Sequence, residues 1–155
     1  MGKALLAVGT LLVLLIAVLI LSVYLTQDEE SYAVDNLLAE NLSREIAIAE
    51  DNRRRVDLAT VAAFEWDEVL VVAEDTPHEA IEEALGSDFR GELNYDIESH
   101  ELFVFLRDGE LVRYADYRGR GRFAGLERPI DRLSREEAVF SVRDLVVRPV
   151  GAARS

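Results

Sequence analysis

The chain has 155 residues, no cysteine, and 30 acidic against 17 basic residues, which gives a net charge of −13. Without cysteine it forms no disulfide and carries out no thiol chemistry. Residues 27–86 carry seventeen acids and four arginines, whereas residues 87–155 carry thirteen acids and twelve arginines. Because phosphate binding needs a net basic face, we expect no nucleic-acid partner.

The first predicted element is a membrane anchor at Ala4–Leu25. These 22 residues are uncharged, and fifteen of them are leucine, valine or isoleucine. A helix of this length rises about 33 Å, close to the hydrocarbon thickness of a bilayer. The alternative is a cleaved signal peptide, whose apolar part is usually shorter and ends in small residues. We therefore predict a signal anchor that stays in the lipid bilayer as a transmembrane helix.

The distribution of positive charge predicts the orientation of this anchor. The free N-terminus and Lys3 precede it, and no arginine follows it until Arg44. By the positive-inside rule, residues 1–3 are a short cytoplasmic tip and residues 26–155 lie on the other side. We expect a single-pass protein of the cytoplasmic membrane with an extracytoplasmic C-terminal domain.

Residues 26–64 follow the anchor, and from Ser31 to about Phe64 their composition is helical, with no proline or glycine. A polar segment near Asp51 interrupts the pattern, so the region is either one kinked helix or two helices. It is either the first helix of the domain, covering its sheet, or a stalk that pairs with another copy or another membrane protein. The apolar stripe on which this prediction rests comprises Val34, Leu37, Leu38, Leu42 and Ile46.

Trp66 and Asp67 lead into the next predicted element, a strand at Glu68–Ala73. Its consecutive valine and leucine residues are typical of a strand that is buried on both faces. Two interpretations of Trp66, the only tryptophan, stay open. It is either a core residue whose N–H bonds a neighbour while Asp67 caps a turn, or an exposed aromatic anchor for a partner.

A helix from Pro77 to Leu85 is predicted next. Thr76 and Glu79 have the spacing of a capping box, in which each side chain accepts a hydrogen bond from the backbone of the other. Pro77 falls at the first helical position, where its missing N–H costs nothing. Gly86 follows the last apolar residue and is the favoured left-handed cap.

A β-hairpin is predicted at Leu102–Arg107 and Leu111–Tyr117, because Asp108-Gly109 lies between two segments with β-type composition. Farther along, Ser134 and Glu137 again have capping-box spacing.

The last predicted strand is Ala138–Val147, broken at Asp144. Residues 150–155 are expected to form a disordered tail.

Several of these motifs occur together in a recognisable order. They resemble a family of short, membrane-anchored or exported bacterial proteins of uncharacterised function, over roughly residues 60–118. The resemblance implies an extracytoplasmic α+β domain and carries no activity with it. The motifs are Phe64-Glu65-Trp66-Asp67, Thr76-Pro77-His78-Glu79-Ala80-Ile81 through Leu85-Gly86, Phe103-Val104-Phe105, Asp108-Gly109 and Leu111-Val112.

One local cluster of positive charge lies on and before a glycine-spaced loop. Guanidinium groups on a flexible loop can bind phosphate or carboxylate groups in a bidentate way. The alternative is that they pair with the acidic first half of the chain. The four residues are Arg113, Arg118, Arg120 and Arg122.

The inventory of catalytic groups is poor. The two histidines, His78 and His100, lie in no metal-binding pattern, and no G-x-S-x-G sequence occurs. His78 is expected to be a solvated surface residue. We therefore expect no enzymatic activity, no metal and no cofactor.

Together these elements predict an α+β protein with a transmembrane helix, a helical stalk or first helix, and a domain at residues 65–149. This domain is predicted to be a small, mainly antiparallel sheet of about four strands with one or more helices packed on it. The expected function is non-enzymatic interaction or assembly with an envelope or membrane protein, or with a second copy of the chain. The alternative is a domain that binds an anion or small ligand through the Arg-Gly loop.

Overall fold

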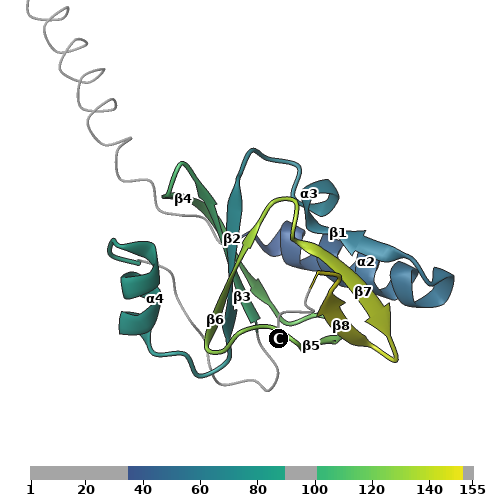
Figure 1. The fold of residues 1–155 in the computed structure, drawn as a ribbon. Helices are drawn as coiled ribbons and strands as arrows, with labels where there is room; N and C mark the ends of the chain where they lie inside the picture. Colours follow the sequence, from purple (N-terminus) through teal and green to yellow (C-terminus); the bar gives the residue numbers. More distant parts are fainter. Residues whose placement is uncertain (1–34, 90–100, 152–155) are drawn as a thin grey trace, which may run out of the picture. The chain divides into compact units, whose positions relative to one another are not determined.

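The computed structural model describes residues 35–89 and 101–151 of the chain. They belong to one compact unit, residues 32–155, and form an α+β fold with three helices and two four-stranded sheets (Figure 1). In chain order the elements are α2 (Asn36–Asn52), β1 (Arg55–Asp57), α3 (Leu58–Val61), β2 (Glu68–Ala73), α4 (His78–Leu85), β3 (Glu101–Arg107), β4 (Glu110–Tyr117), β5 (Arg122–Phe123), β6 (Ile130–Ser134), β7 (Val139–Arg143) and β8 (Val146–Pro149).

The predicted membrane anchor, Ala4–Leu25, lies outside the described residues, and so do residues 26–34 of the predicted helical region. Within residues 35–89 and 101–151, no helix is both long and apolar enough to cross a membrane. The membrane location therefore stays a prediction from the sequence.

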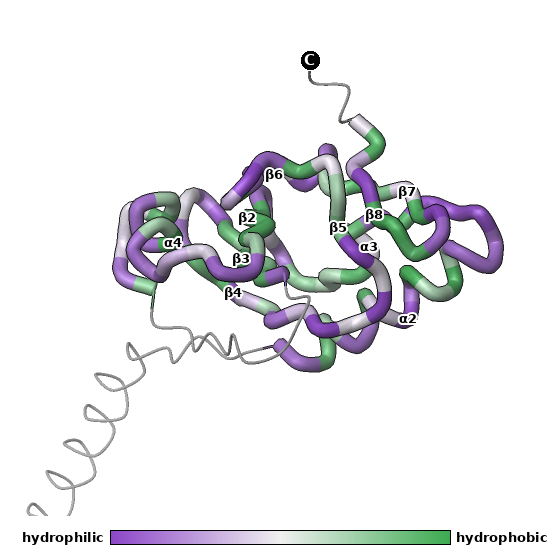
Figure 2. Tube along the Cα trace, turned by 90° about the horizontal axis from the view of Figure 1, so that it is seen from below, coloured by the Kyte–Doolittle hydropathy of each residue, from purple (hydrophilic) through white to green (hydrophobic). Residues whose placement is uncertain are grey.

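The first sheet is built around β2 and β3. Its strand order is β4-β3-β2-β6, and every neighbouring pair is antiparallel. The strand predicted at Glu68–Ala73 is confirmed as β2, and its four central residues are all buried. Because successive side chains of a strand point to opposite faces, both faces of this sheet must be covered. Figure 2 shows hydrophobic residues following one another along β2.

Each face of the first sheet has its own apolar core. One core includes Leu70 of β2, Val104 of β3 and Ile81 of α4. The other includes Val71 of β2 and Phe140 of the second sheet, together with the buried side chains of α2. In Figure 1, α4 lies on one side of the first sheet, whereas α2 and the second sheet lie on the other.

The second sheet corrects the prediction of a single sheet of about four strands. Its order is β1-β7-β8-β5, with β5 parallel to β8 and the other pairs antiparallel. The sequence did not predict β1, β5 or β6, because strands of two to five residues are too short to show an alternating pattern.

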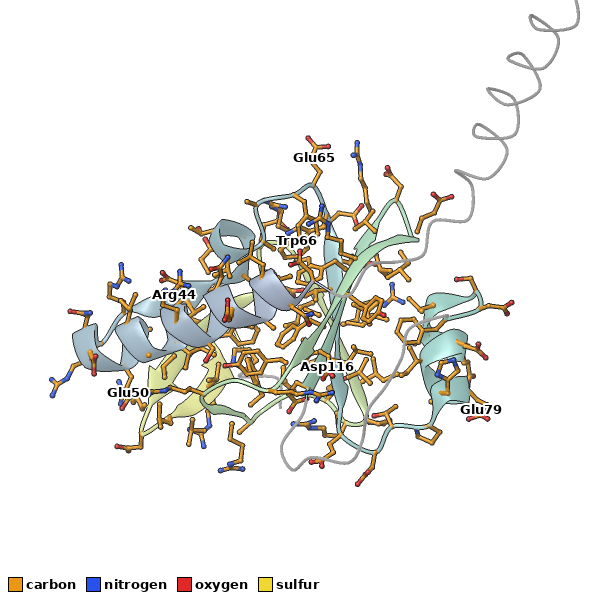
Figure 3. All side chains as sticks on the ribbon, turned by 180° about the vertical axis from the view of Figure 1, so that it is seen from behind. Arg44, Glu50, Glu65, Trp66, Glu79 and Asp116 are labelled. Carbon is orange, nitrogen blue, oxygen red and sulfur yellow. The ribbon has the colours of Figure 1, made fainter. Side chains whose placement is uncertain are left out.

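The break expected at Asp144 is the turn between β7 and β8. Asp144 and Leu145 have φ angles of 52° and 56°, in the left-handed region. The Glu50 carboxylate, at the end of α2, accepts hydrogen bonds from both backbone N–H groups, at 2.9 and 3.4 Å. Figure 3 labels Glu50 beside this turn. The predicted long strand is therefore a hairpin that α2 holds in place.

Helix α2 confirms three residues of the apolar stripe, Leu38, Leu42 and Ile46, whereas Leu37 is exposed and Val34 lies outside the described residues. Asp35 caps the helix by accepting a hydrogen bond of 2.9 Å from the Leu38 N–H. The helix ends at Asn52, before Arg53 takes a left-handed φ of 53°. Residues 53–64 do not continue it, because β1 pairs with β7 and α3 is only four residues long. The buried side chains, Leu38, Leu42, Ile46 and Ala49, cover the domain's own sheet.

Helix α4 confirms the predicted helix but not its N-terminal cap. Pro77 is the cap residue, and no side chain caps the helix. The capping box is wrong because the Thr76 hydroxyl donates instead to the Ala73 carbonyl, at 2.6 Å. Gly86 is confirmed as the left-handed C-terminal cap, with a φ of 70°.

The second capping-box pattern forms its hydrogen bonds without forming a helix. The Glu137 carboxylate accepts from the Ser134 N–H at 3.1 Å, and the Ser134 hydroxyl accepts from the Glu137 N–H at 3.3 Å. These bonds close the turn between β6 and β7. Of the predicted tail, the Val150 N–H donates to Val139, and residues 152–155 lie outside the described residues.

Candidate functional site

Trp66 lies in the core of the domain. Its side chain is only 4% exposed, and its ring packs edge-on against Phe105 with centroids 5.2 Å apart. The indole N–H donates to the Ala62 carbonyl at 3.4 Å. The Arg135 guanidinium lies 4.9 Å from the centre of the ring. In Figure 3 Trp66 lies within the domain, as the core interpretation requires, so its ring offers no surface to a partner.

Asp67 joins two turns of the fold. Its carboxylate accepts a hydrogen bond of 2.7 Å from the Asp108 N–H, and its carbonyl accepts one of 2.8 Å from the Arg135 N–H. Asp108 and Gly109 have φ angles of 53° and 82°, which confirms the predicted hairpin between β3 and β4. The role expected for Asp67, capping a turn, is the one the structure shows.

Arg113 does not belong with the other three arginines of the predicted cluster. It lies on extended strand β4, five residues before Arg118 and so about 17 Å from the start of the Arg-Gly loop. Its guanidinium pairs with Asp35 at 2.9 Å and lies 4.7 Å from the centre of the Phe64 ring. Arg113 therefore ties β4 to the start of α2, and part of the cluster pairs with the acidic first half.

A groove of about 260 Å³ runs beside this ion pair, between the start of α2 and residues 61–64. Leu37 lines it and is 64% exposed, the highest value among the large apolar side chains of the described residues. The half-buried Val61 and Phe64 form its other apolar wall. The sequence placed Leu37 in the apolar stripe, and only the packing of α2 shows that it points away from the core. We refer to this feature as the Leu37 groove.

The Arg-Gly loop, residues 118–121, is held against α2. The Ser43 hydroxyl of α2 accepts a hydrogen bond of 3.0 Å from the Arg120 N–H. The Tyr117 hydroxyl donates to the Arg120 carbonyl. Burial raises the pKa of Tyr117 to about 12, although its hydrogen bond with Ser43 acts in the opposite direction. The loop is therefore fixed by its backbone, which contradicts its description as flexible.

The glycines of this loop are needed because the backbone passes close to the core. A Cβ atom on Gly119 would lie 2.6 Å from Ser43 Cβ and 2.7 Å from Tyr117 Cζ. One on Gly121, where φ is 94°, would lie 2.9 Å from a methyl group of Val147. The two glycines therefore allow the backbone of the loop to pass close to α2 and β8, and they do not serve to make the loop flexible.

The arginine side chains of the loop differ in their contacts. Arg118 pairs with Asp116, with its Nη2 2.5 Å from the carboxylate. Within residues 35–89 and 101–151, the guanidinium groups of Arg120 and Arg122 form no ion pair. Arg122 lines a cavity of about 280 Å³ near the ends of β3 and β4.

The same cavity contains a paired carboxylate that the sequence did not single out. Glu101 receives hydrogen bonds from both terminal nitrogens of Arg128, at 2.7 and 3.0 Å. Burial raises the pKa of Glu101 above its ordinary value of 4.5; the Arg128 guanidinium lowers it, and the nearby Glu74 raises it further. This cavity therefore presents both charges.

The groups considered for catalysis are either engaged or outside the described residues. His78 Nε2 lies 2.6 Å from the Phe89 carbonyl and 3.6 Å from Glu82, so His78 is not simply solvated. His100 lies outside the described residues. In the part of the chain that the structure describes, no three metal-ligating side chains converge.

No protein-family model, no curated protein and no solved structure matches this chain. The described residues offer two candidate binding sites, the Leu37 groove and the cavity lined by Arg122, Glu101 and Arg128, which we refer to as the Arg122 cavity.

We expect Gly119→Ala to lower the free energy of unfolding by about 1–3 kcal/mol, because the new methyl group collides with Ser43 and Tyr117. The matched control is Gly151→Ala, where a Cβ atom would meet nothing within 4 Å and the change should be close to zero. Urea unfolding of both variants measures the difference. Equal stability of the two would show that the loop is not fixed against α2.

The raised pKa of Glu101 predicts how stability depends on pH. The folded state holds this proton more tightly than the unfolded state does, so the contribution of Glu101 to stability is lost as the pH rises above 4.5 through the folded pKa. The stability of the wild type minus that of Glu101→Gln should therefore fall over this window. Urea unfolding at a series of pH values between about 4 and 7 measures it. A difference that rises with pH would mean that Arg128 outweighs burial.

Proposed function

We propose that this protein is a single-pass membrane protein whose extracytoplasmic α+β domain binds another protein of the cell envelope without catalysing a reaction. Ala4–Leu25 supplies the anchor, and the position of Lys3 sets the orientation. The observation that carries the proposal is the Leu37 groove. It combines an exposed apolar side chain with a concave surface at the start of the domain.

The position of the groove in the chain suits a partner in the same membrane. Ten residues, 26–35, separate the end of the predicted anchor from the first residue of α2. A fully extended chain of this length spans at most about 35 Å, which is the upper limit on the distance between the end of the predicted anchor and the start of α2. A tether of this kind raises the local concentration of membrane partners, so that a weak contact is sufficient.

The chemistry of the groove indicates what it would bind. Leu37, Val61 and Phe64 offer apolar surface, and the ion pair of Arg113 with Asp35 lies at the edge. A volume of about 260 Å³ accommodates one large apolar side chain of a partner. The acidic first half of the chain favours a partner whose surrounding surface is basic.

A photo-crosslinking phenylalanine analogue at position 37 of the full-length protein in native membranes tests this proposal. Leu37 is 64% exposed in the groove, and Leu145, which is 43% exposed at the turn between β7 and β8, is the matched control position. We expect one discrete adduct from position 37 and none from position 145. The mass of the adduct shows whether the partner is a different protein or a second copy.

A second variant separates binding from folding. Leu37→Asp should leave the unfolding midpoint almost unchanged, because the side chain is exposed, and should abolish co-purification of the crosslinked partner. Recovery of the monomer alone from position 37, or the same products from both positions, would contradict a partner at this groove.

A second candidate function, binding of a small anion, rests on the Arg122 cavity. Arg122 lines about 280 Å³ of space, and neither its guanidinium nor that of Arg120 forms an ion pair within the described residues. Replacing Arg118, Arg120 and Arg122 together by serine distinguishes the two roles. Loss of binding to inorganic phosphate with unchanged stability supports an anion site, whereas loss of stability alone supports a structural role.

A further inference from the structure

Asp131 of β6 is a buried carboxylate in a position that the strand pattern assigns to an apolar side chain. Along β6, Asp131 and Leu133 are buried, whereas Arg132 between them is exposed. Only two polar or charged residues of the described ranges are buried, Asp131 and Thr76, and Thr76 hydrogen-bonds to the carbonyl of Ala73. Asp131 is 6% exposed.

The carboxylate of Asp131 has no partner among the described residues. No hydrogen bond or ion pair reaches it, although its backbone lies in register with Val71 of β2. An ionised carboxylate that is buried without a partner is strongly unfavourable. The side chain therefore indicates that a group other than the described residues compensates its charge.

A cavity of about 360 Å³ gives such a group access to Asp131. It is lined by residues of β6 in the first sheet, by Pro149 at the end of β8 in the second sheet, and by residues 125–127. Its size is at the lower end of the range for small-molecule sites. The residues that define its chemistry are Asp131, Leu133, Leu126, Glu127, Glu137 and Pro149.

The lining of the cavity selects the charge and the shape of its ligand. Of the described residues that line it, three are acidic and none is basic, so the site favours a cation. Leu126, Leu133 and Pro149 favour an alkyl group beside that charge. A metal ion fits less well, because no three ligating side chains converge in the described part of the chain.

We propose that this cavity binds a small organic cation, a primary alkylammonium group, whose N–H groups donate to the Asp131 carboxylate while its alkyl chain contacts Leu126 and Leu133. Glu137 already accepts from the Ser134 N–H, so Asp131 is the principal partner of the ligand. This site is separate from the Leu37 groove and does not depend on it, because the two share no lining residue.

Calorimetric titration of the full-length protein in nanodiscs with n-butylammonium chloride tests the proposal. The titration is performed at about 0.15 M salt, which screens binding to the acidic surface. We expect saturable binding of n-butylammonium and none of 1-butanol, which has a similar shape but no charge. Binding of 1-butanol with equal affinity, or the absence of saturable binding of n-butylammonium, would overturn the proposal.

Two variants assign the binding to the buried carboxylate. Asp131→Asn should weaken n-butylammonium binding at least about tenfold, because a charged hydrogen-bond acceptor is lost. Glu136→Gln removes the same charge from an exposed position in the turn between β6 and β7 and should bind like the wild type.

Thermal unfolding without ligand shows that Asp131→Asn folds, and its midpoint should equal or exceed that of the wild type because an unpaired buried charge is removed. Equal affinities of wild type and Asp131→Asn would contradict the assignment. If the variant does not fold, a rise in the unfolding midpoint of the wild type with n-butylammonium, but not with sodium at equal ionic strength, decides the question.

Discussion

The structure depends on the need to cover both faces of the pair of strands β2 and β3. Every residue from Val69 to Val72 is buried, and so is every residue from Leu102 to Leu106. Apolar side chains on two faces require two separate layers above and below the sheet. Helix α4 supplies one layer, and α2 with the second sheet supplies the other. Helix α2 is therefore part of the folded domain and not an independent stalk.

The arginines of the second half of the chain mostly serve this arrangement. Arg113 ties β4 to Asp35 at the start of α2, Arg132 joins β6 to Glu68 of β2, and Arg135 packs on Trp66. Surface ion pairs of this kind each contribute little, at most about 1 kcal/mol. Their positions nevertheless show that arginines of the second half of the chain pair with carboxylates of the same domain. Because the chain has more acidic than basic residues, other acidic side chains are left without such a pair.

Elements whose signals are local could be predicted from the sequence. The bounds of β2, the hairpin at Asp108-Gly109 and the cap at Gly86 each follow from a few neighbouring residues. The second sheet could not be predicted, because its strands have two to five residues and its pairings of β1 with β7 and of β5 with β8 join segments far apart in the chain. The pattern of Thr76 and Glu79 failed because the Thr76 hydroxyl donates to the carbonyl of Ala73, the last residue of β2.

The candidate sites were harder to predict from the sequence than the local elements, because each site is formed by segments that are far apart in the chain. Trp66 and Asp67 could be assigned a structural role in advance, and the structure gives them one. Exposure of Leu37 depends on how α2 lies on the sheet, since its neighbour Leu38 is buried. Asp131 occupies a buried position of the five-residue strand β6, where an apolar residue is expected. This signal could not be recognised from the sequence, because β6 itself was not predicted.

Hydrogen exchange of the full-length protein in nanodiscs, followed by mass spectrometry, tests most directly whether α2 belongs to the domain. If α2 covers the sheet, amides of residues 38–49 should exchange only when the whole domain unfolds, at rates within about tenfold of those in β2 and β3. Exchange in α2 that is faster by about a thousandfold or more would contradict the account, because it would show a helix that opens independently of the sheet.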